Sequence, residues 1–173
     1  AALLLHEPSE SADERLAVWR GLLATRSAHP KLLAGVSNFA VAQIAALETA
    51  TGERPVANEI EFHPWVSDET FRLVHWCRER QISVIAYNSL GGKRNQARGN
   101  VVAELAKRHR VSNAQVLLRF ALQHGVRVIP GATSRAHIEQ NLNLSCFALD
   151  ETETALLRGS ARPKAFAKYA THR

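Results

Sequence analysis

The sequence predicts an α/β fold on a parallel sheet, made of about five strand–helix units in one domain over residues 1–173. Three observations predict it. Short apolar runs alternate with longer amphipathic runs along the whole chain, as in a parallel sheet with crossover helices. The short runs are almost continuously apolar, which is typical of strands buried on both faces. The chain has 173 residues, 46% of them hydrophobic, enough for a real core.

The expected strands are the short apolar runs, and each ends where polar residues, Gly or Pro begin. The first ends at a histidine, the third runs into His63-Pro64, and the last stops before Pro130. The expected strands are Leu3–His6, Leu32–Ser37, Val56–Phe62, Ser83–Ser89 and Val126–Ile129.

The expected helices show apolar residues at helical spacing and start or stop signals at their ends. Gly52 and Gly125 follow two of them, and Ser67 or Asp68 and Ser112 or Asn113 offer N-caps for two others. The expected helices are Ala12–Arg26, Val41–Thr51, Asp68–Arg80, Val101–Arg110, Ser112–His124, Ser134–Leu144 and Asp150–Arg158. Residues 161–173 are expected to form a peripheral tail.

Five units fit either an open doubly wound sheet or most of a (β/α)8 barrel, and the pattern alone does not separate these folds. No G-x-G-x-x-G loop follows a strand, which disfavours a dinucleotide-binding Rossmann domain. An eight-stranded α/β barrel typically needs about 250 residues. The chain is shorter and contains no methionine, even at position 1. We therefore expect either a processed start or a fragment.

Composition disfavours several function classes. The net charge is +6, but the basic residues are scattered without interleaved aromatics, so we expect no nucleic-acid partner. The apolar run at residues 1–5 is too short for a signal peptide, and no run approaches the roughly 20 residues of a membrane span. Cys77 and Cys146 match no disulfide or metal pattern. We expect a soluble cytoplasmic protein with free thiols, no metal and no membrane partner.

Function collects at the carboxyl ends of parallel strands in both candidate folds. These ends supply a histidine, amides, hydroxyls, carboxylates, an aromatic ring and a turn that opens a helix, where backbone N–H groups favour a phosphate. A carboxamide-bearing aromatic ligand with phosphates would use each of these groups. The residues are His6, Ser37, Asn38, Glu59, Glu61, His63, Tyr87, Asn88, Ser89 and Pro130–Thr133.

Each of these residues also has a structural alternative. His6 can be a capped structural histidine, and Ser37-Asn38 can cap the next helix. Tyr87 can pack in the core with its hydroxyl at the rim. His63 and Trp65 fit loop and packing positions, and the turn at 131–134 can be a plain connection. The residues alone leave these alternatives open.

Six segments, in order and with family-like gaps, resemble motifs of the aldo-keto reductases. LLLHEP at residues 3–8 resembles L-x-x-H-W-P, residues 35–39 read GVSNF, and NEIEFHP at residues 58–64 resembles N-Q-x-E-x-H-P. AYNSLG at residues 86–91 resembles A-Y-S-P-L-G, and QVLLRFA at residues 115–121 resembles Q-V-x-L-R-W. Residues 129–141 resemble the last strand and the adenosine-binding helix. The resemblance implies a partial TIM (β/α)8 barrel holding about the last five units.

The resemblance also implies roles at the reacting end of the cofactor. His6 matches the catalytic histidine that hydrogen-bonds the substrate carbonyl, and Glu7 stands beside it in the substrate pocket where the family has Trp. Ser37, Asn38 and Glu59 match the residues that hold the nicotinamide carboxamide. Glu59 replaces the usual Gln, and its negative charge should favour the oxidised cofactor.

The remaining residues match the rest of the nucleotide site. Tyr87 matches the aromatic that stacks on the nicotinamide, and Asn88, Leu90 and Gly92 lie on the loop over the pyrophosphate. The residues matching the adenosine-phosphate site are Gly131, Ala132, Thr133, Ser134, His137, Gln140 and Asn141. Gly131 and His137 replace a usual Lys and Arg, for which Arg135 or the pair Lys93-Arg94 could substitute. The implied cofactor is NADP(H), with NAD(H) as the alternative.

The implied function is NAD(P)H-dependent reduction of a small carbonyl compound, an aldehyde or ketone, to an alcohol. The family's tyrosine acid, with its lysine and aspartate, falls on strands before Ala1, so we expect little or no activity from residues 1–173 alone. The alternative is a non-catalytic half-barrel that binds a nucleotide or a partner. A different phosphate-binding barrel enzyme is the third reading, and the oligomeric state stays open.

Overall fold

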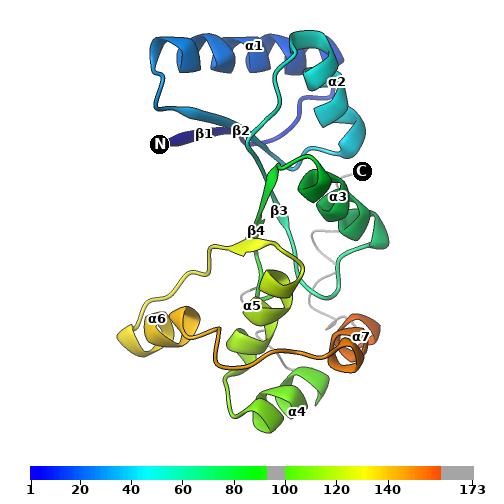
Figure 1. The fold of residues 1–173 in the computed structure, drawn as a ribbon, viewed down its shortest axis with the longest axis vertical. Coiled ribbons are helices and arrows are strands. Elements are labelled where there is room, and N and C mark those ends of the chain that lie inside the picture. Colours follow the sequence, from blue (N-terminus) through cyan, green and yellow to red (C-terminus); the bar gives the residue numbers. More distant parts are fainter. Residues whose placement is uncertain (93–99, 161–173) are drawn as a thin grey trace. The chain divides into compact units, whose positions relative to one another are not determined.

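A computed structural model describes residues 1–92 and 100–160 of the chain, and Figure 1 traces the alternation of its strands and helices. The strands are β1 (Ala2–Leu5), β2 (Leu33–Ser37), β3 (Ala57–Glu61), β4 (Ser83–Tyr87) and β5 (Arg127–Val128). The helices are α1 (Ala12–Ala28), α2 (Val41–Thr51), α3 (Asp68–Glu79), α4 (Asn100–His109), α5 (Asn113–Gln123), α6 (Arg135–Leu142) and α7 (Glu151–Gly159). Every expected strand and helix is present, so the predicted α/β alternation is confirmed.

Gly52 and Ser112, two capping residues that the sequence suggested, fix helix ends, and Asp150 caps a third helix. Gly52 ends α2 in the left-handed conformation, with φ 70°. At α5, the Ser112 hydroxyl accepts from the Gln115 N–H while the Gln115 side chain accepts from the Ser112 N–H, which is a capping box. Asp150 and Glu153 form the same arrangement at α7. The caps of α5 and α7 satisfy N–H groups that a helix leaves without partners in its first turn.

The differences from the expected bounds lie at strand and helix ends. β4 stops at Tyr87 instead of Ser89 because Asn88 has a left-handed backbone with φ 52°. β5 holds only two residues, ending two residues before Pro130, which has no N–H to pair. α6 begins at Arg135 because Ser134 is its N-cap, and it ends at Leu142.

The five strands form one sheet in chain order, β1-β2-β3-β4-β5. β1 pairs with β2 and β2 with β3 in parallel, with Leu4 opposite Gly35 and Ser37 opposite Glu59. Gly35 fits this register because a side chain there would overlap the Leu4 side chain and lie 3.0 Å from the Ala57 carbonyl oxygen. The parallel ladder places the carboxyl ends of β1, β2 and β3 at one edge.

The described chain groups into two compact units. The first unit holds Ala1–Ile60 and Asp68–Ile85, and its core includes Trp19 and Ile44. The second holds Glu61–Ser67 and the chain from Ala86 onward. In the second unit the rings of Phe62 and Phe120 stack with centroids 6.1 Å apart. A single domain over residues 1–173 stays a prediction, and the expected tail at 161–173 lies outside the described residues.

Candidate functional site

In the first unit, Ser37 and Asn38 form a hydrogen-bonded pair at the carboxyl end of β2. Ser37 is 3% exposed, and its hydroxyl donates to the Glu59 carbonyl oxygen at 2.9 Å. The Asn38 side-chain amide donates to Ser37 Oγ at 3.2 Å and to the His6 carbonyl oxygen at 3.2 Å. The two side chains are therefore held beside the ends of β1 and β3, where the sequence predicted a ligand site.

The backbone at Asn38 rules out the capping alternative for this pair. Asn38 has φ 63°, in the left-handed region, and its N–H donates to the Glu59 carbonyl oxygen at 2.9 Å. α2 begins three residues later, after Ala40, so Ser37 and Asn38 do not cap it. The residues belong to the strand end and its turn.

His6, Glu7 and Glu59 complete the polar groups at this edge. The His6 and Glu7 side chains are exposed just after β1, and Glu59 is half-buried on β3. Within the described part of the chain, the Glu59 carboxylate has no hydrogen-bond or ion-pair partner. Glu59 is opposite Ser37 in the strand register, and a carboxylate, a hydroxyl and an amide together supply both acceptors and donors, which is what a bound carboxamide requires.

In the second unit, Asn88 and His63 meet on the carboxylate of Glu61. The Asn88 amide donates to Glu61 Oε1 at 2.7 Å, and His63 Nε2 lies 3.1 Å from the same oxygen. His63 is wholly buried, and its Nδ1 accepts from the Trp65 N–H at 3.2 Å. This pattern assigns the proton to Nε2, which then donates to Glu61. The packing role expected for His63 and Trp65 is confirmed, and the Glu61 contact fixes Asn88 at the end of β4.

The other predicted nucleotide residues also lie in the second unit. Tyr87 ends β4 half-buried, and Leu90 and Gly92 follow it. Gly131, Ala132 and Thr133 form the turn before α6, and the Ser134 hydroxyl accepts from the His137 N–H at 3.3 Å. His137 and Gln140 are exposed on α6, and Asn141 is half-buried there. Lys93 and Arg94, the alternative phosphate ligands, lie outside the described residues.

Sequence reasoning missed Asn58, which is wholly buried on β3. Its side-chain amide donates to the Phe39 carbonyl oxygen at 2.8 Å, and the Phe39 N–H donates to Asn58 Oδ1 at 3.4 Å. Phe39 directly follows Asn38 in the turn. Asn58 is the first residue of the family-like segment NEIEFHP, but nothing in the sequence indicated that it contacts the turn after β2.

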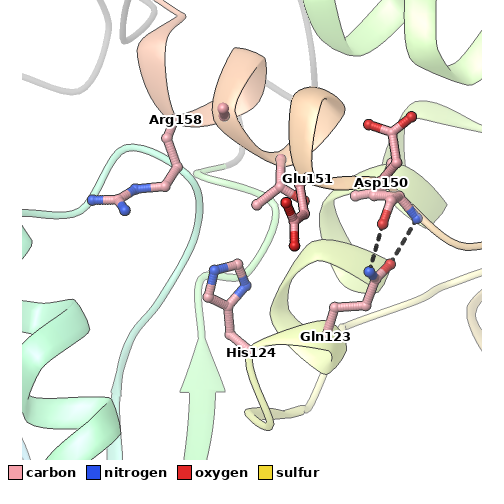
Figure 2. Close-up of a pocket in the computed structure, with 8 residues that line it drawn as sticks. Gln123, His124, Asp150, Glu151 and Arg158 are labelled. Carbon is pink, nitrogen blue, oxygen red and sulfur yellow. Dashed lines mark hydrogen bonds between the residues drawn. The ribbon is translucent and has the colours of Figure 1, made fainter.

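A hollow of about 340 Å³ lies between the end of α5 and α7 (Figure 2). Gln123 borders this hollow. Its side-chain amide accepts a hydrogen bond from the Leu149 N–H at 2.8 Å and donates one to the Leu149 carbonyl oxygen at 2.7 Å. The lining residues are Gln123, His124, Leu149, Asp150, Glu151, Thr154, Ala155 and Arg158. None of the site residues predicted from the sequence lines this hollow.

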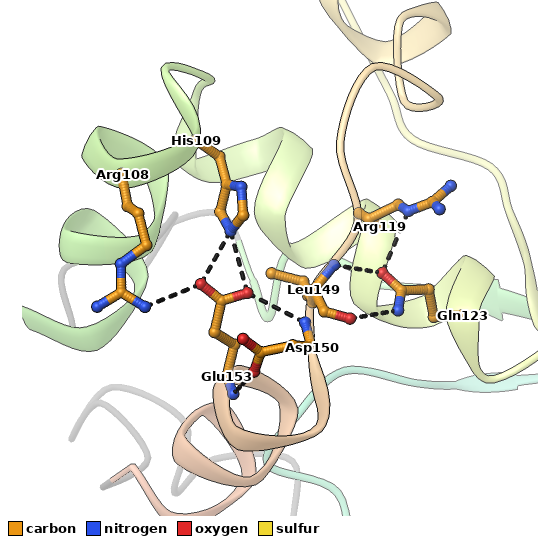
Figure 3. Close-up of polar contacts among 7 residues, drawn as sticks. All are labelled: Arg108, His109, Arg119, Gln123, Leu149, Asp150 and Glu153. Atoms are coloured by element: carbon orange, nitrogen blue, oxygen red, sulfur yellow. Dashed lines mark hydrogen bonds and ion pairs between the residues drawn. The ribbon is translucent and has the colours of Figure 1, made fainter.

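A buried carboxylate, Glu153, joins α7 to α4 (Figure 3). Its oxygens lie 2.9 and 3.0 Å from His109 Nε2, and Arg108 donates to Oε1 at 3.0 Å. Burial alone would raise the pKa of the Glu153 carboxyl, but hydrogen bonds from the Asp150 N–H, His109 and Arg108 outweigh it. The pKa of Glu153 is therefore lowered overall. This cluster holds α4 and α7 together and contains none of the site residues predicted from the sequence.

Two further findings concern residues 1–92 and 100–160, the part of the chain that the structure describes. No helix in these ranges is both long and apolar enough to cross a membrane. The same ranges hold no group of three or more His, Cys, Asp or Glu side chains placed to bind a metal ion.

Curated relatives are about a third identical to this chain over the aligned residues. A 9,11-endoperoxide prostaglandin H2 reductase of Trypanosoma cruzi is 31% identical over 152 residues, covering 87% of this chain and 52% of the relative. A methylglyoxal reductase, YeaE, of Escherichia coli is 35% identical over 161 residues, covering 84% of this chain and 57% of the relative. The chain thus spans about half the length of the curated relatives it matches.

Solved structures agree with the fold. An aldo-keto reductase of Bombyx mori in complex with NADP superposes with a TM-score of 0.77 at 31% identity, covering 91% of this chain and 56% of that one. A point mutant of Gox0644 in complex with NADPH gives a TM-score of 0.80 at 26% identity, covering 91% and 57%. The model of the aldo/keto reductase family matches residues 3–162, nearly the whole chain with its strand-end residues. This chain belongs to the aldo/keto reductase family.

Proposed function

We propose that the protein reduces aldehydes or ketones to alcohols with NADP(H). The observation that supports this most is the polar cluster of Ser37, Asn38 and Glu59 at the carboxyl ends of parallel strands, in a chain of this family. Solved relatives hold NADP or NADPH. When bound, NADPH supplies the hydride.

The nicotinamide end is assigned to the first unit. A carboxamide has an NH2 that donates and a carbonyl that accepts. The Glu59 carboxylate, half-buried and without a partner in the described chain, would accept from the NH2. The Ser37 hydroxyl and the Asn38 amide, already hydrogen-bonded to each other, would supply the remaining contacts. The donor set therefore fits a carboxamide.

The substrate contact is assigned to His6. Its imidazole is exposed just past β1, while its carbonyl is fixed by the Asn38 amide at 3.2 Å. An imidazole N–H at this place would donate to a substrate carbonyl oxygen and orient it. Glu7, the next residue, would make the substrate pocket polar.

The 2′-phosphate end is assigned to the second unit, at the start of α6. Ser134 uses its hydroxyl to cap α6, and the first N–H groups of a helix attract a phosphate. Arg135, 92% exposed in its side chain, pairs with Glu139 at 2.8 Å. Such an exposed i,i+4 pair is worth only about 0.2–0.5 kcal/mol, so a phosphate could take Glu139's place. Arg135 would then replace the family's missing cation.

The test measures nucleotide binding and turnover separately on the full chain. Wild type should bind NADPH more tightly than NADH, and Arg135→Ala should reduce that preference on the order of tenfold, because a charge-assisted phosphate contact is lost. Arg127→Ala, which removes another exposed cation of the second unit, is the matched control and should leave the preference unchanged. Absence of saturable NADPH binding would refute the proposal.

One observation favours the alternative of a non-catalytic nucleotide-binding protein. In residues 1–92 and 100–160, the His6 imidazole has no hydrogen-bond partner that would hold its ring in one orientation. Consumption of NADPH in the presence of a panel of aldehydes would refute the alternative. Because residues 1–173 alone are expected to show little or no activity, tight binding without carbonyl-dependent turnover would agree with both functions.

A further inference from the structure

Asn58 connects β3 to the turn that follows β2, inside the first unit. Its carboxamide satisfies both backbone groups of one residue, with the Phe39 carbonyl oxygen 2.8 Å from Nδ2 and the Phe39 nitrogen 3.4 Å from Oδ1. Asn58 is 0% exposed and Phe39 1% exposed. Water cannot substitute for these bonds, so loss of the amide would leave buried backbone groups without partners.

Glu59, the next residue of β3, holds Asn38, the residue of the turn that precedes Phe39. The Glu59 carbonyl oxygen accepts from the Asn38 N–H at 2.9 Å, in register with the Ser37–Glu59 pairing of the strands. Between these two anchors, Asn38 keeps φ 63°, a left-handed conformation that is uncommon outside glycine, although asparagine adopts it more often than most residues. Two consecutive residues of β3 thus fix two consecutive residues of the turn.

The conformation of Asn38 decides where its side chain lies. With the left-handed backbone, its amide reaches Ser37 Oγ and the His6 carbonyl, each at 3.2 Å. If Phe39 were released, the backbone of Asn38 could relax toward ordinary φ values and carry the amide away. Ser37 would stay in place, because its hydroxyl is bonded to the β3 backbone at 2.9 Å. Release of Phe39 would therefore displace the Asn38 amide and leave the Ser37 hydroxyl where it is.

We propose that Asn58 is a positioning residue for nicotinamide binding, acting through Phe39 to hold the Asn38 amide in place. The proposal rests on the proposed function, in which Ser37 and Asn38 contact the nicotinamide carboxamide. Asn58 itself does not contact the cofactor in this account. Its role is to keep the turn in the conformation that binds.

The experiment compares two nucleotides on the full chain by calorimetric titration. NADP⁺ carries the nicotinamide, and 2′,5′-ADP lacks it but keeps the 2′-phosphate and adenosine. Wild type should bind NADP⁺ more tightly. Asn58→Leu should reduce the ratio of the two affinities on the order of tenfold, corresponding to about one hydrogen bond. The affinity for 2′,5′-ADP alone should change little, whereas general destabilisation would weaken both nucleotides together.

Two further variants separate a loss of positioning from a loss of stability. Asn58→Ser retains a hydroxyl and should reduce the ratio less than leucine does, which covers the case in which the leucine variant does not fold. Thr51→Val is the matched control, because Thr51 Oγ1 donates to the Leu47 carbonyl at 2.7 Å and accepts from Trp19 at 3.3 Å in the same unit. It should lower stability and leave the ratio unchanged.

The outcomes separate the two proposals. If wild type favours NADP⁺ and the folded Asn58 variants keep the same ratio, the positioning role is wrong and the proposed function stands. If wild type binds NADP⁺ and 2′,5′-ADP equally, the contact of Ser37 and Asn38 with the nicotinamide is wrong, and the positioning role falls with it. If wild type binds neither nucleotide, both proposals are overturned.

Discussion

Replacement of Glu153 by glutamine should lower the free energy of unfolding by about 1–2 kcal/mol near neutral pH. Glu153 is 3% exposed and accepts hydrogen bonds from the Asp150 N–H, Arg108 and His109 (Figure 3). Glutamine has nearly the same shape but has one acceptor oxygen in place of two, and carries no charge. The variant therefore isolates the charge with little change in packing.

The size of this loss in unfolding free energy depends on which hydrogen bonds to residue 153 remain in the glutamine variant. Glutamine at the third position of a helix also forms a capping box, so the bond from the Asp150 N–H can remain. Hydrogen bonds to charged groups are worth about 1.5–3 kcal/mol in partly buried positions. Arg108 is 63% exposed in its side chain and will be solvated by water after the change, whereas His109 is 20% exposed and loses more. The loss should therefore lie near the lower end of this range.

The effect should depend on pH with a definite sign. The folded-state pKa of Glu153 is lowered, so its carboxylate stabilises the fold fully above the unfolded-state pKa of about 4.3. That contribution is lost as the pH falls through the folded-state pKa, where the wild-type group also becomes neutral. The difference between wild type and Glu153→Gln should consequently shrink in acid.

Urea unfolding followed by circular dichroism, at neutral pH and in steps below pH ~4.3, measures this difference. Glu151→Gln removes the same charge from the first turn of the same helix, but Glu151 is exposed. This control should cost no more than about 1 kcal/mol, the value of a charge beside the helix dipole. A difference for Glu153→Gln that stays constant across the pH range would refute the assigned role of the charge.

Two further predictions concern a thiol and a glycine. Burial raises the pKa of the Cys77 thiol to about 11, so a thiol reagent near neutral pH should label the exposed Cys146 first and reach Cys77 only on unfolding, as peptide mass mapping would show. Gly35→Ala should lower the free energy of unfolding by about 1–3 kcal/mol, because the added methyl group meets Leu4 and the Ala57 carbonyl; an unchanged urea midpoint would contradict this.

Much of the fold could be predicted because the signals are local. Val41–Thr51 was predicted to the residue, since its apolar spacing and Gly52 define both ends. Strand ends were less accurate, because a left-handed residue such as Asn88 ends β4 without a Gly or Pro to show it. The same limitation hid the conformation of Asn38, which is decided by hydrogen bonds from another strand.

The candidate site was predicted as a set of residues and only partly as an arrangement. Family-like motifs indicated Ser37 and Asn38, and the structure brings them together at a strand end. Contacts between residues that are distant in the sequence cannot be predicted from local patterns. The hydrogen bond between Glu153 and His109 joins residues 44 positions apart. The hydrogen bonds between Asn58 and Phe39 join residues 19 positions apart, which the register of β2 and β3 brings together.

Two side-chain amides in this protein make the same contact in different surroundings, and the difference indicates which one can carry a functional role. Asn58 bonds both backbone groups of Phe39, and Gln123 bonds both backbone groups of Leu149. Gln123 is exposed and borders an open hollow, and its two bonds to Leu149 are only partly buried (Figure 2). Asn58 is wholly buried, and each unsatisfied group left behind would cost about 1–3 kcal/mol. Loss of the Asn58 amide should therefore be the more costly of the two, and the turn that it holds carries Asn38.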